Sequence, residues 1–103
     1  MKIHELLCDE SQWCKDAEAL DAAGKRLDAT DDNAICWCVR GAAEVCYPEV
    51  SERDQILDRL ITYLKVSGRA VPLEECDCII IEWNDRTSTS FVEVRAVLLE
   101  LDL

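Results

Sequence analysis

Cysteine is the residue in this 103-residue chain with the most obvious chemical potential. Seven are present, as two close pairs and three single residues: Cys36-x-Cys38, Cys76-x-Cys78, Cys8, Cys14 and Cys46. Structural zinc sites usually use cysteine pairs two to four residues apart. On a helix, thiols two positions apart point about 200° away from each other, and only in a strand do they share a face. We therefore expect free, buried thiols that pack as small apolar side chains, with no metal ligand and no cofactor.

No combination of nucleophile and base stands out. The chain has no Cys-x-x-Cys, and no cysteine has the basic setting that lowers a thiol pKa. His4 is the only histidine, and we interpret it as a surface residue. The acid pairs Asp31-Asp32 and Glu74-Glu75 suit the first turn of a helix, because carboxylates are favourable at the positive end of the helix dipole. We therefore expect no catalytic residue and no enzyme activity.

The charge of the chain points to a protein partner. Twenty-two acids against 11 Lys and Arg give a net charge of -11, which repels nucleic acids and anionic membranes and favours a partner with a basic surface. The first ten residues carry acids where a signal peptide would be apolar, so we expect a cytoplasmic protein. The candidate partner-binding residues are acids expected on exposed helix faces: Asp9, Glu10, Asp54, Asp58, Glu74, Asp77 and Glu82.

A central helix is predicted over residues 32–47. One apolar stripe of helical spacing comprises Ile35, Cys38, Val39, Ala42 and Cys46. Asp31 and Asp32 would cap its start, and Pro48 would end it. Gly41 lies inside this helix, where glycine costs about 1 kcal/mol relative to alanine. We therefore expect a neighbouring backbone or ring to pack closely against Gly41.

Two other helices and a turn are predicted before residue 70. Residues 2–14 have helical spacing, and residues 15–30 are expected to be irregular, with a small hairpin that turns at Asp21–Gly24 and a positive φ at Gly24. Ser51 and Asp54 resemble a capping box, which would begin an amphipathic helix that ends before Gly68.

The last two segments allow either helix or strand. In residues 72–83, Pro72 suits the first turn of a helix, but Cys78–Ile81 is rich in β-branched residues. In residues 91–101, Ser90 and Glu93 form a capping box, yet alternate residues from Val92 to Leu98 are apolar. We predict an all-α fold of four or five short helices in one domain, residues 1–103. The alternative is an α+β fold with a C-terminal β-hairpin.

Three local patterns resemble a known family. They are Asp21-Ala22-Ala23-Gly24, then Trp37-Cys38-Val39-Arg40-Gly41-Ala42, then Trp83-Asn84-Asp85 followed by Thr87 and Phe91-Val92-Glu93-Val94-Arg95. This set, across roughly residues 13–100, is similar to a family of small bacterial and phage proteins known only as a domain of unknown function. The resemblance favours helices in both ambiguous segments and implies no activity.

The three tryptophans are interpreted as core residues. Trp83 is followed by Asn84 and Asp85, which we interpret as a helix end that hydrogen-bonds the next turn, with a contact loop as the alternative.

Two functional hypotheses follow. The first is a non-enzymatic acidic protein-binding module; the phage members of the family suggest a phage-encoded inhibitor that blocks a basic, nucleic-acid-binding host defence complex, in the host cytoplasm. The alternative is a thiol-rich protein that binds a metal or responds to redox conditions.

Overall fold

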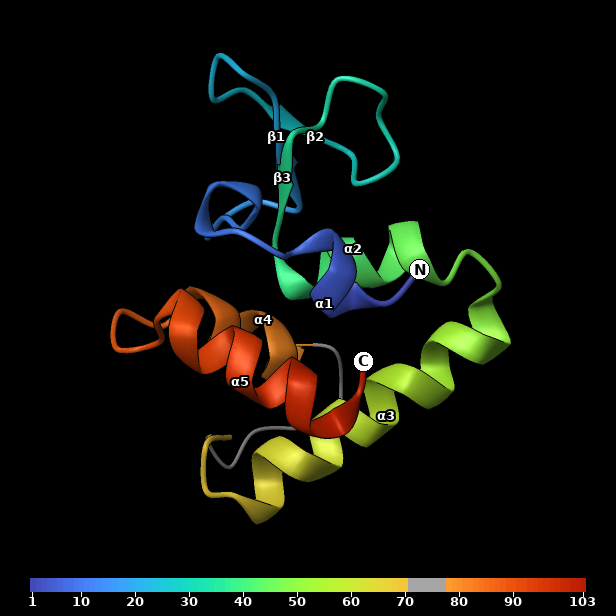
Figure 1. The fold of residues 1–103 in the computed structure, drawn as a ribbon, viewed down its shortest axis with the longest axis vertical. Helices are drawn as coiled ribbons and strands as arrows, with labels where there is room; N and C mark the ends of the chain where they lie inside the picture. The colour runs from blue at the N-terminus through green and yellow to red at the C-terminus, as the bar shows by residue number, and fades with distance from the viewer. Residues whose placement is uncertain (71–77) are drawn as a thin grey trace.

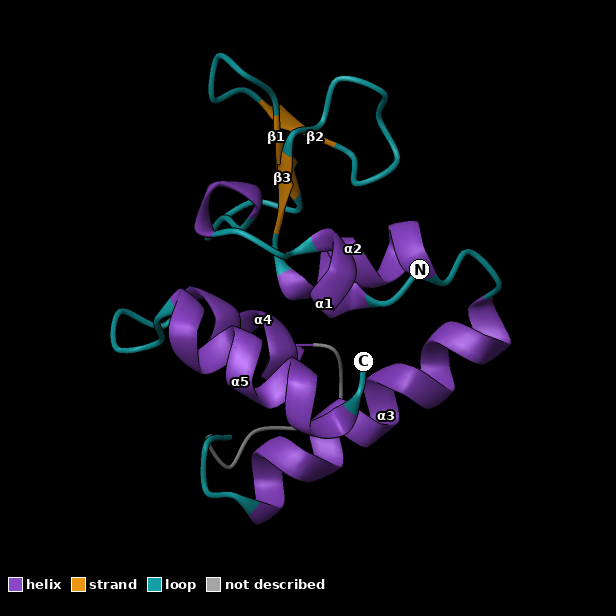
Figure 2. Ribbon diagram, in the orientation of Figure 1, coloured by secondary structure: helices purple, strands orange, loops and turns teal. Residues whose placement is uncertain are grey.

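A small sheet forms one end of the molecule and helices form the rest (Figure 1, Figure 2). The structure is a computed structural model and describes residues 1–70 and 78–103. The elements in chain order are α1 (Ile3–Leu6), the 3-10 helix η1 (Glu10–Gln12), β1 (Ala19–Leu20), β2 (Arg26–Leu27), β3 (Cys36–Trp37), α2 (Val39–Cys46), α3 (Val50–Val66), α4 (Cys78–Asp85) and α5 (Phe91–Leu101).

The predicted four or five helices are present as α1 to α5, but the sheet makes the fold mixed and not all-α. The strands of the sheet are antiparallel in the order β2-β1-β3, and Ala19 of β1 lies opposite both Leu27 and Trp37. The alternative fold was right to include strands but placed them wrongly, because α4 and α5 are helices. The predicted hairpin turn is confirmed: Asp21 Oδ1 accepts hydrogen bonds from the amides of Ala23 and Lys25, and Gly24 has φ +79°.

Helix α2 begins at Val39 and not at Asp32, because residues 36–37 pair with β1. Cys38 is extended, and its sulfur accepts a hydrogen bond from the Gly41 amide at 3.2 Å. Cys38 therefore caps this helix in place of Asp31 and Asp32, and Ile35, predicted on its apolar stripe, is 51% exposed.

The prediction for Gly41 is confirmed. A Cβ at this position would lie 2.3 Å from the main-chain oxygen of Glu18. Glycine is therefore needed for α2 to lie against the segment that leads into β1.

The N-terminal segment is less helical than predicted. The Asp9 carboxylate accepts hydrogen bonds from Ser11 and starts η1, a separate turn. Trp13 then forms a parallel bridge with Trp37, and the Cys14 amide donates to the Trp37 oxygen at 3.1 Å. Residues 13 and 14 therefore extend the sheet and not the first helix.

The later helices follow the sequence patterns closely. Helix α3 buries Leu57, Leu60 and Leu64, and Gly68 has φ +75° just beyond its end, as predicted. Its N-cap is Glu49, with no side-chain cap bond, so the capping box at Ser51 and Asp54 was wrong. The prediction for Pro72 lies outside the described residues.

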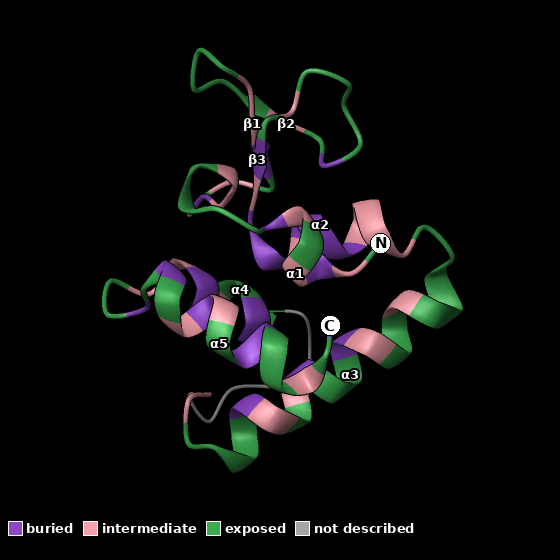
Figure 3. Ribbon diagram, in the orientation of Figure 1, coloured by how far each residue is buried: buried purple, intermediate pink, exposed green. Residues whose placement is uncertain are grey.

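The core lies between the helices (Figure 3). Helix α2 contacts α1, α3 and α4, as expected for a central helix. Trp83 is fully buried, and Trp13 and Trp37 pack against the core from its edge. Within the described part of the chain, no helix has the length and apolarity needed to cross a membrane.

Candidate functional site

The sheet, α2 and α4 enclose a groove of about 610 Å³. Its walls carry four acids, two arginines, Ala17, Cys38 and Ile81. The acids are Asp16, Glu18, Glu44 and Asp85, and the arginines are Arg26 and Arg40. A volume of this size suits a small molecule or a long side chain of a partner, because ligand pockets typically span about 300–1,000 Å³.

Glu18 and Glu44 form a carboxyl pair in this groove. The main-chain oxygen of Glu18 accepts a hydrogen bond from the Cys38 amide at 3.2 Å, and its Oε1 accepts from the Ala29 amide at 3.1 Å. Glu44 lies on α2 and forms an ion pair with Arg40 at 3.1 Å. These contacts hold the two carboxyl groups close to each other.

A hydrogen bond between the two carboxyl groups, which one shared proton would supply, moves their pKa values in opposite directions. This hydrogen bond raises the pKa of Glu18 and lowers the pKa of Glu44. Burial further raises the pKa of Glu18, and Arg40 further lowers that of Glu44. The pair can therefore hold one proton, or accept a cationic group in place of that proton.

Asn84 fixes the helices that bound the groove. It is fully buried, and its Oδ1 accepts from Trp13 Nε1 at 2.8 Å and from the Val39 amide at 3.0 Å. Its Nδ2 donates to the Cys14 oxygen at 3.1 Å and to Asp85 Oδ1 at 2.8 Å. The structural interpretation of Asn84 is therefore supported, but its main partners lie far along the chain and not in the next turn.

Asp85 positions the segment that leads into Glu18. Its Oδ1 accepts from the Asp16 amide at 2.9 Å, and Asp16 has φ +63°. The left-handed region is unfavourable for most residues but tolerated by aspartate. Asp85 therefore fixes the backbone on one side of the groove.

Three thiols, Cys14, Cys36 and Cys38, are free and buried, as predicted, and Cys38 lines the groove. Burial raises the pKa of Cys14 and of Cys38. Cys46 is free and half-buried, and burial raises its pKa to about 11. In residues 1–70 and 78–103, no group of three His, Cys, Asp or Glu side chains could hold a metal ion.

The prediction of free, buried thiols fails at two other cysteines. Cys8 is free but exposed. Cys78, at the start of α4, is exposed and disulfide-bonded. Cys76 lies outside the described residues.

The acids predicted to bind a partner are spread over separate elements. Asp9 and Glu10 are exposed at η1, and Asp54 and Asp58 are exposed one turn apart on α3. Helix α3 and η1 lie on different sides of the molecule (Figure 1). Glu82 is half-buried and binds Arg86 at 2.5 Å. Glu74 and Asp77 lie outside the described residues.

The acids of the groove, which are Asp16, Glu18, Glu44 and Asp85, were not predicted as site residues from the sequence. Gly41 was the one signal, since an internal glycine indicates close packing. It does not identify Glu18 as the residue packed there.

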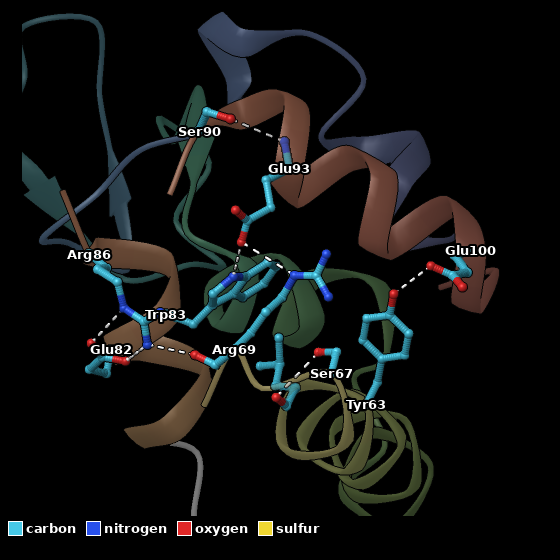
Figure 4. A network of polar contacts seen from close by, with 10 residues as sticks. Tyr63, Ser67, Arg69, Glu82, Trp83, Arg86, Ser90, Glu93 and Glu100 are labelled. Atoms are coloured by element: carbon cyan, nitrogen blue, oxygen red, sulfur yellow. Dashed lines mark hydrogen bonds and ion pairs between the residues drawn. The ribbon is translucent and has the colours of Figure 1, made fainter. Parts of the chain in front are cut away.

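A second polar network joins the ends of three helices (Figure 4). Glu93 Oε2 accepts from Trp83 Nε1 at 2.6 Å and lies 3.6 Å from Arg69 Nε. Arg86 binds Glu82 and donates to the Arg69 oxygen at 2.7 Å. The Arg86–Glu82 pair lies at the end of α4 itself, whereas the other contacts join α4 and α5 to each other or to the residues after α3, so we assign this network to stability.

The comparisons with known proteins identify a family and no activity. A family model described as a family of unknown function, DUF6197, matches residues 1–101. No curated protein and no solved structure matches the chain.

Proposed function

The chain belongs to the family of unknown function DUF6197, and from its own geometry we propose that it is a protein-binding module for a basic partner. The observation that carries this proposal is the groove with the Glu18–Glu44 carboxyl pair. A lysine or arginine side chain from the partner would enter the groove, and its charge would replace the proton that the pair shares.

The groove provides suitable chemistry for an arginine. A guanidinium offers several N–H donors in a plane and binds carboxylates through paired hydrogen bonds. Arg40 holds Glu44 in place from the side, as their 3.1 Å contact indicates. The Glu18 carboxyl is held through Oε1 by the Ala29 amide, and its other oxygen would bind the incoming cation.

The net charge of -11 supports the same proposal at longer range. A strongly acidic surface attracts a basic partner and speeds its association. Exposed acids outside the groove, such as Asp9, Glu10, Asp54 and Asp58, would contribute to this attraction. The more specific form of the proposal is an inhibitor that occupies the nucleic-acid-binding surface of a host defence complex, where its carboxylates compete with phosphates.

The test is a tagged pull-down from bacterial lysate, eluted in steps of rising salt. The wild-type protein should retain a basic, nucleic-acid-handling protein and release it as salt increases, because surface charges are screened within about 8–10 Å at physiological ionic strength. Glu18→Gln should weaken retention, since it leaves only the Glu44 carboxylate to bind the cation and keeps the side-chain shape.

The matched control is the double variant Asp54→Asn, Asp58→Asn. It removes two charges from the exposed face of α3, outside the groove, and should weaken retention less than the single change at Glu18. Retention that does not respond to salt, or that is equal in wild type and Glu18→Gln, would reject the proposal.

A further inference from the structure

Ile81 of α4 is the large apolar side chain on the wall of the groove. It is 43% exposed, whereas its neighbours Ile79 and Ile80 are fully buried in the core. The core contacts of α4 come from those neighbours and from Trp83, and not from Ile81. Burying the exposed surface of Ile81 against a bound group is favourable, because it removes apolar surface from water.

The wall that carries Ile81 meets the beginning of α2. Ile81 and Asp85 lie four residues apart, on the same side of α4, and both line the groove. The residue next to Asp85 is Asn84, whose Oδ1 accepts the Val39 amide at 3.0 Å. Val39 is the first residue of α2. The apolar end of the groove therefore lies near the start of this helix.

The carboxyl end of the groove lies further along α2. Glu44 follows Val39 by five residues, which corresponds to about 7.5 Å along a helix. Helical side chains lean toward the N-terminus of their helix, and the Glu44 carboxylate contacts Arg40, one turn back, at 3.1 Å. The two ends of the groove are therefore about 6–8 Å apart along α2.

The carboxylate at the apolar end is already engaged. Asp85 Oδ1 accepts hydrogen bonds from the Asp16 amide at 2.9 Å and from Asn84 Nδ2 at 2.8 Å. These two N–H donors fix Asp85 in place and partly balance its charge. We therefore assign selection at this end of the groove to Ile81, and a second basic residue of the partner is the alternative that the experiment tests.

A partner segment in extended conformation matches the spacing of the two ends. Side chains two residues apart in a strand lie on the same face, about 6.6–6.8 Å from each other. We propose that the groove binds an extended segment of the partner in which a basic and an aliphatic residue are separated by one residue. The basic side chain lies between Glu18 and Glu44, and the aliphatic side chain packs on Ile81. This inference rests on the proposed function and adds the sequence pattern that the partner presents.

Three five-residue peptides with blocked ends and a central arginine test this pattern. In the first, leucine lies two positions from the arginine on each side, and serine lies between. In the second, the leucines and serines exchange places, and in the third, lysine replaces both leucines of the first. Because each peptide is symmetric about its arginine, the result does not depend on the direction in which the segment binds.

Amide chemical shifts of the isotope-labelled protein give the dissociation constant of each peptide and show whether Val39 and Ile81 respond. The titrations are made at raised ionic strength, where long-range attraction is screened. We expect the first peptide to bind about three- to tenfold more tightly than the second, the change expected when part of an aliphatic side chain leaves water. The lysine peptide should bind more weakly than the first.

Variants locate the preference for leucine. Ile81→Ala should remove the difference between the first two peptides. Val92→Ala, at an exposed apolar residue of α5 outside the groove, is the matched control and should keep it. Glu18→Gln should weaken the binding of both peptides by the same factor, because both carry the arginine.

Four results would each overturn the inference: equal binding of the first two peptides, tightest binding of the lysine peptide, a preference that survives Ile81→Ala, or no response to any peptide. The proposed function is decided separately, by the response of the pull-down to salt and to Glu18→Gln. Arginine peptides that bind in a Glu18-dependent way without a preference for leucine would therefore reject the pattern and leave the proposed function standing.

Discussion

At the scale of single residues, Asn84 shows why an amide is required at one buried position. Its oxygen accepts two N–H groups and its nitrogen donates to two oxygens, so all four contacts use the same planar group. An aspartate could accept but could not donate, and it would place a second charge beside Asp85. A leucine could do neither.

Asn84→Ala should lower the free energy of unfolding by about 2–4 kcal/mol, because it leaves buried donors and acceptors without partners. The groups affected are Trp13 Nε1, the Val39 amide and the Cys14 oxygen. Urea unfolding measures the loss. The control is Asn33→Ala in an exposed loop, which should change stability by less than about 0.5 kcal/mol. An equal effect of the two variants would contradict the assigned role of Asn84.

At the scale of elements, helices with local signals were predictable and strands were not. Helices α3 and α5 each have apolar residues at helical spacing. The signals for their ends are also local, because Gly68 follows α3 within two residues and Ser90 directly precedes α5. Residues 36–37 lie inside the helix that was predicted over residues 32–47. They became strand β3 because Ala19 and Leu20 pair with them, and that partner lies too far away for a local pattern to reveal.

Helix α5 illustrates a local signal that was partly right. The hydroxyl of Ser90 accepts the Glu93 amide at 3.2 Å, as a capping box predicts. The Glu93 carboxylate turns instead to Trp83 of α4 (Figure 4), because a buried indole N–H needs an acceptor. One half of the motif therefore caps α5, and the other half joins α5 to α4.

Ser90→Ala should destabilise the protein by about 1 kcal/mol, the usual cost of removing an N-cap hydroxyl. Thermal or urea unfolding measures the change. Ser88→Ala, in the exposed loop just before α5, is the control and should be close to neutral. If Ser88→Ala costs as much as Ser90→Ala, the effect does not come from the cap.

At the scale of the whole molecule, the groove depends on contacts between distant parts of the chain. Glu18 precedes the sheet and Glu44 lies near the end of α2. They meet because Gly41 lets α2 approach the Glu18 main chain and because Asp85 fixes the backbone at Asp16. With 22 acids in the sequence, no spacing rule selects this pair, so only the fold could reveal it.

The carboxyl pair should give the whole molecule a characteristic pH dependence. The pKa of Glu18 is raised above its ordinary value of 4.5, so near that pH the folded state holds a proton that the unfolded state has lost. The stability from this proton is complete below about pH 4.5 and is lost as the pH rises through the raised pKa. The lowered pKa of Glu44 acts in the opposite sense, and its contribution is lost only as the pH falls below about 4.5.

Glu18→Gln isolates the Glu18 contribution, because the amide offers Glu44 a permanent N–H donor in place of the proton. We expect the variant and the wild type to melt at similar temperatures at about pH 4.5, and the variant to melt higher at about pH 7.5. Thermal melts followed by circular dichroism across this range measure the difference. The control is Asp54→Asn, at an exposed acid of α3. It should change the melting temperature by a similar small amount at both pH values. If the melting temperatures of Glu18→Gln and wild type differ by the same amount at both pH values, the pair shares no proton.

A Glu18→Gln protein that is more stable than wild type at neutral pH but no longer retains the partner would separate binding from folding at the same residue.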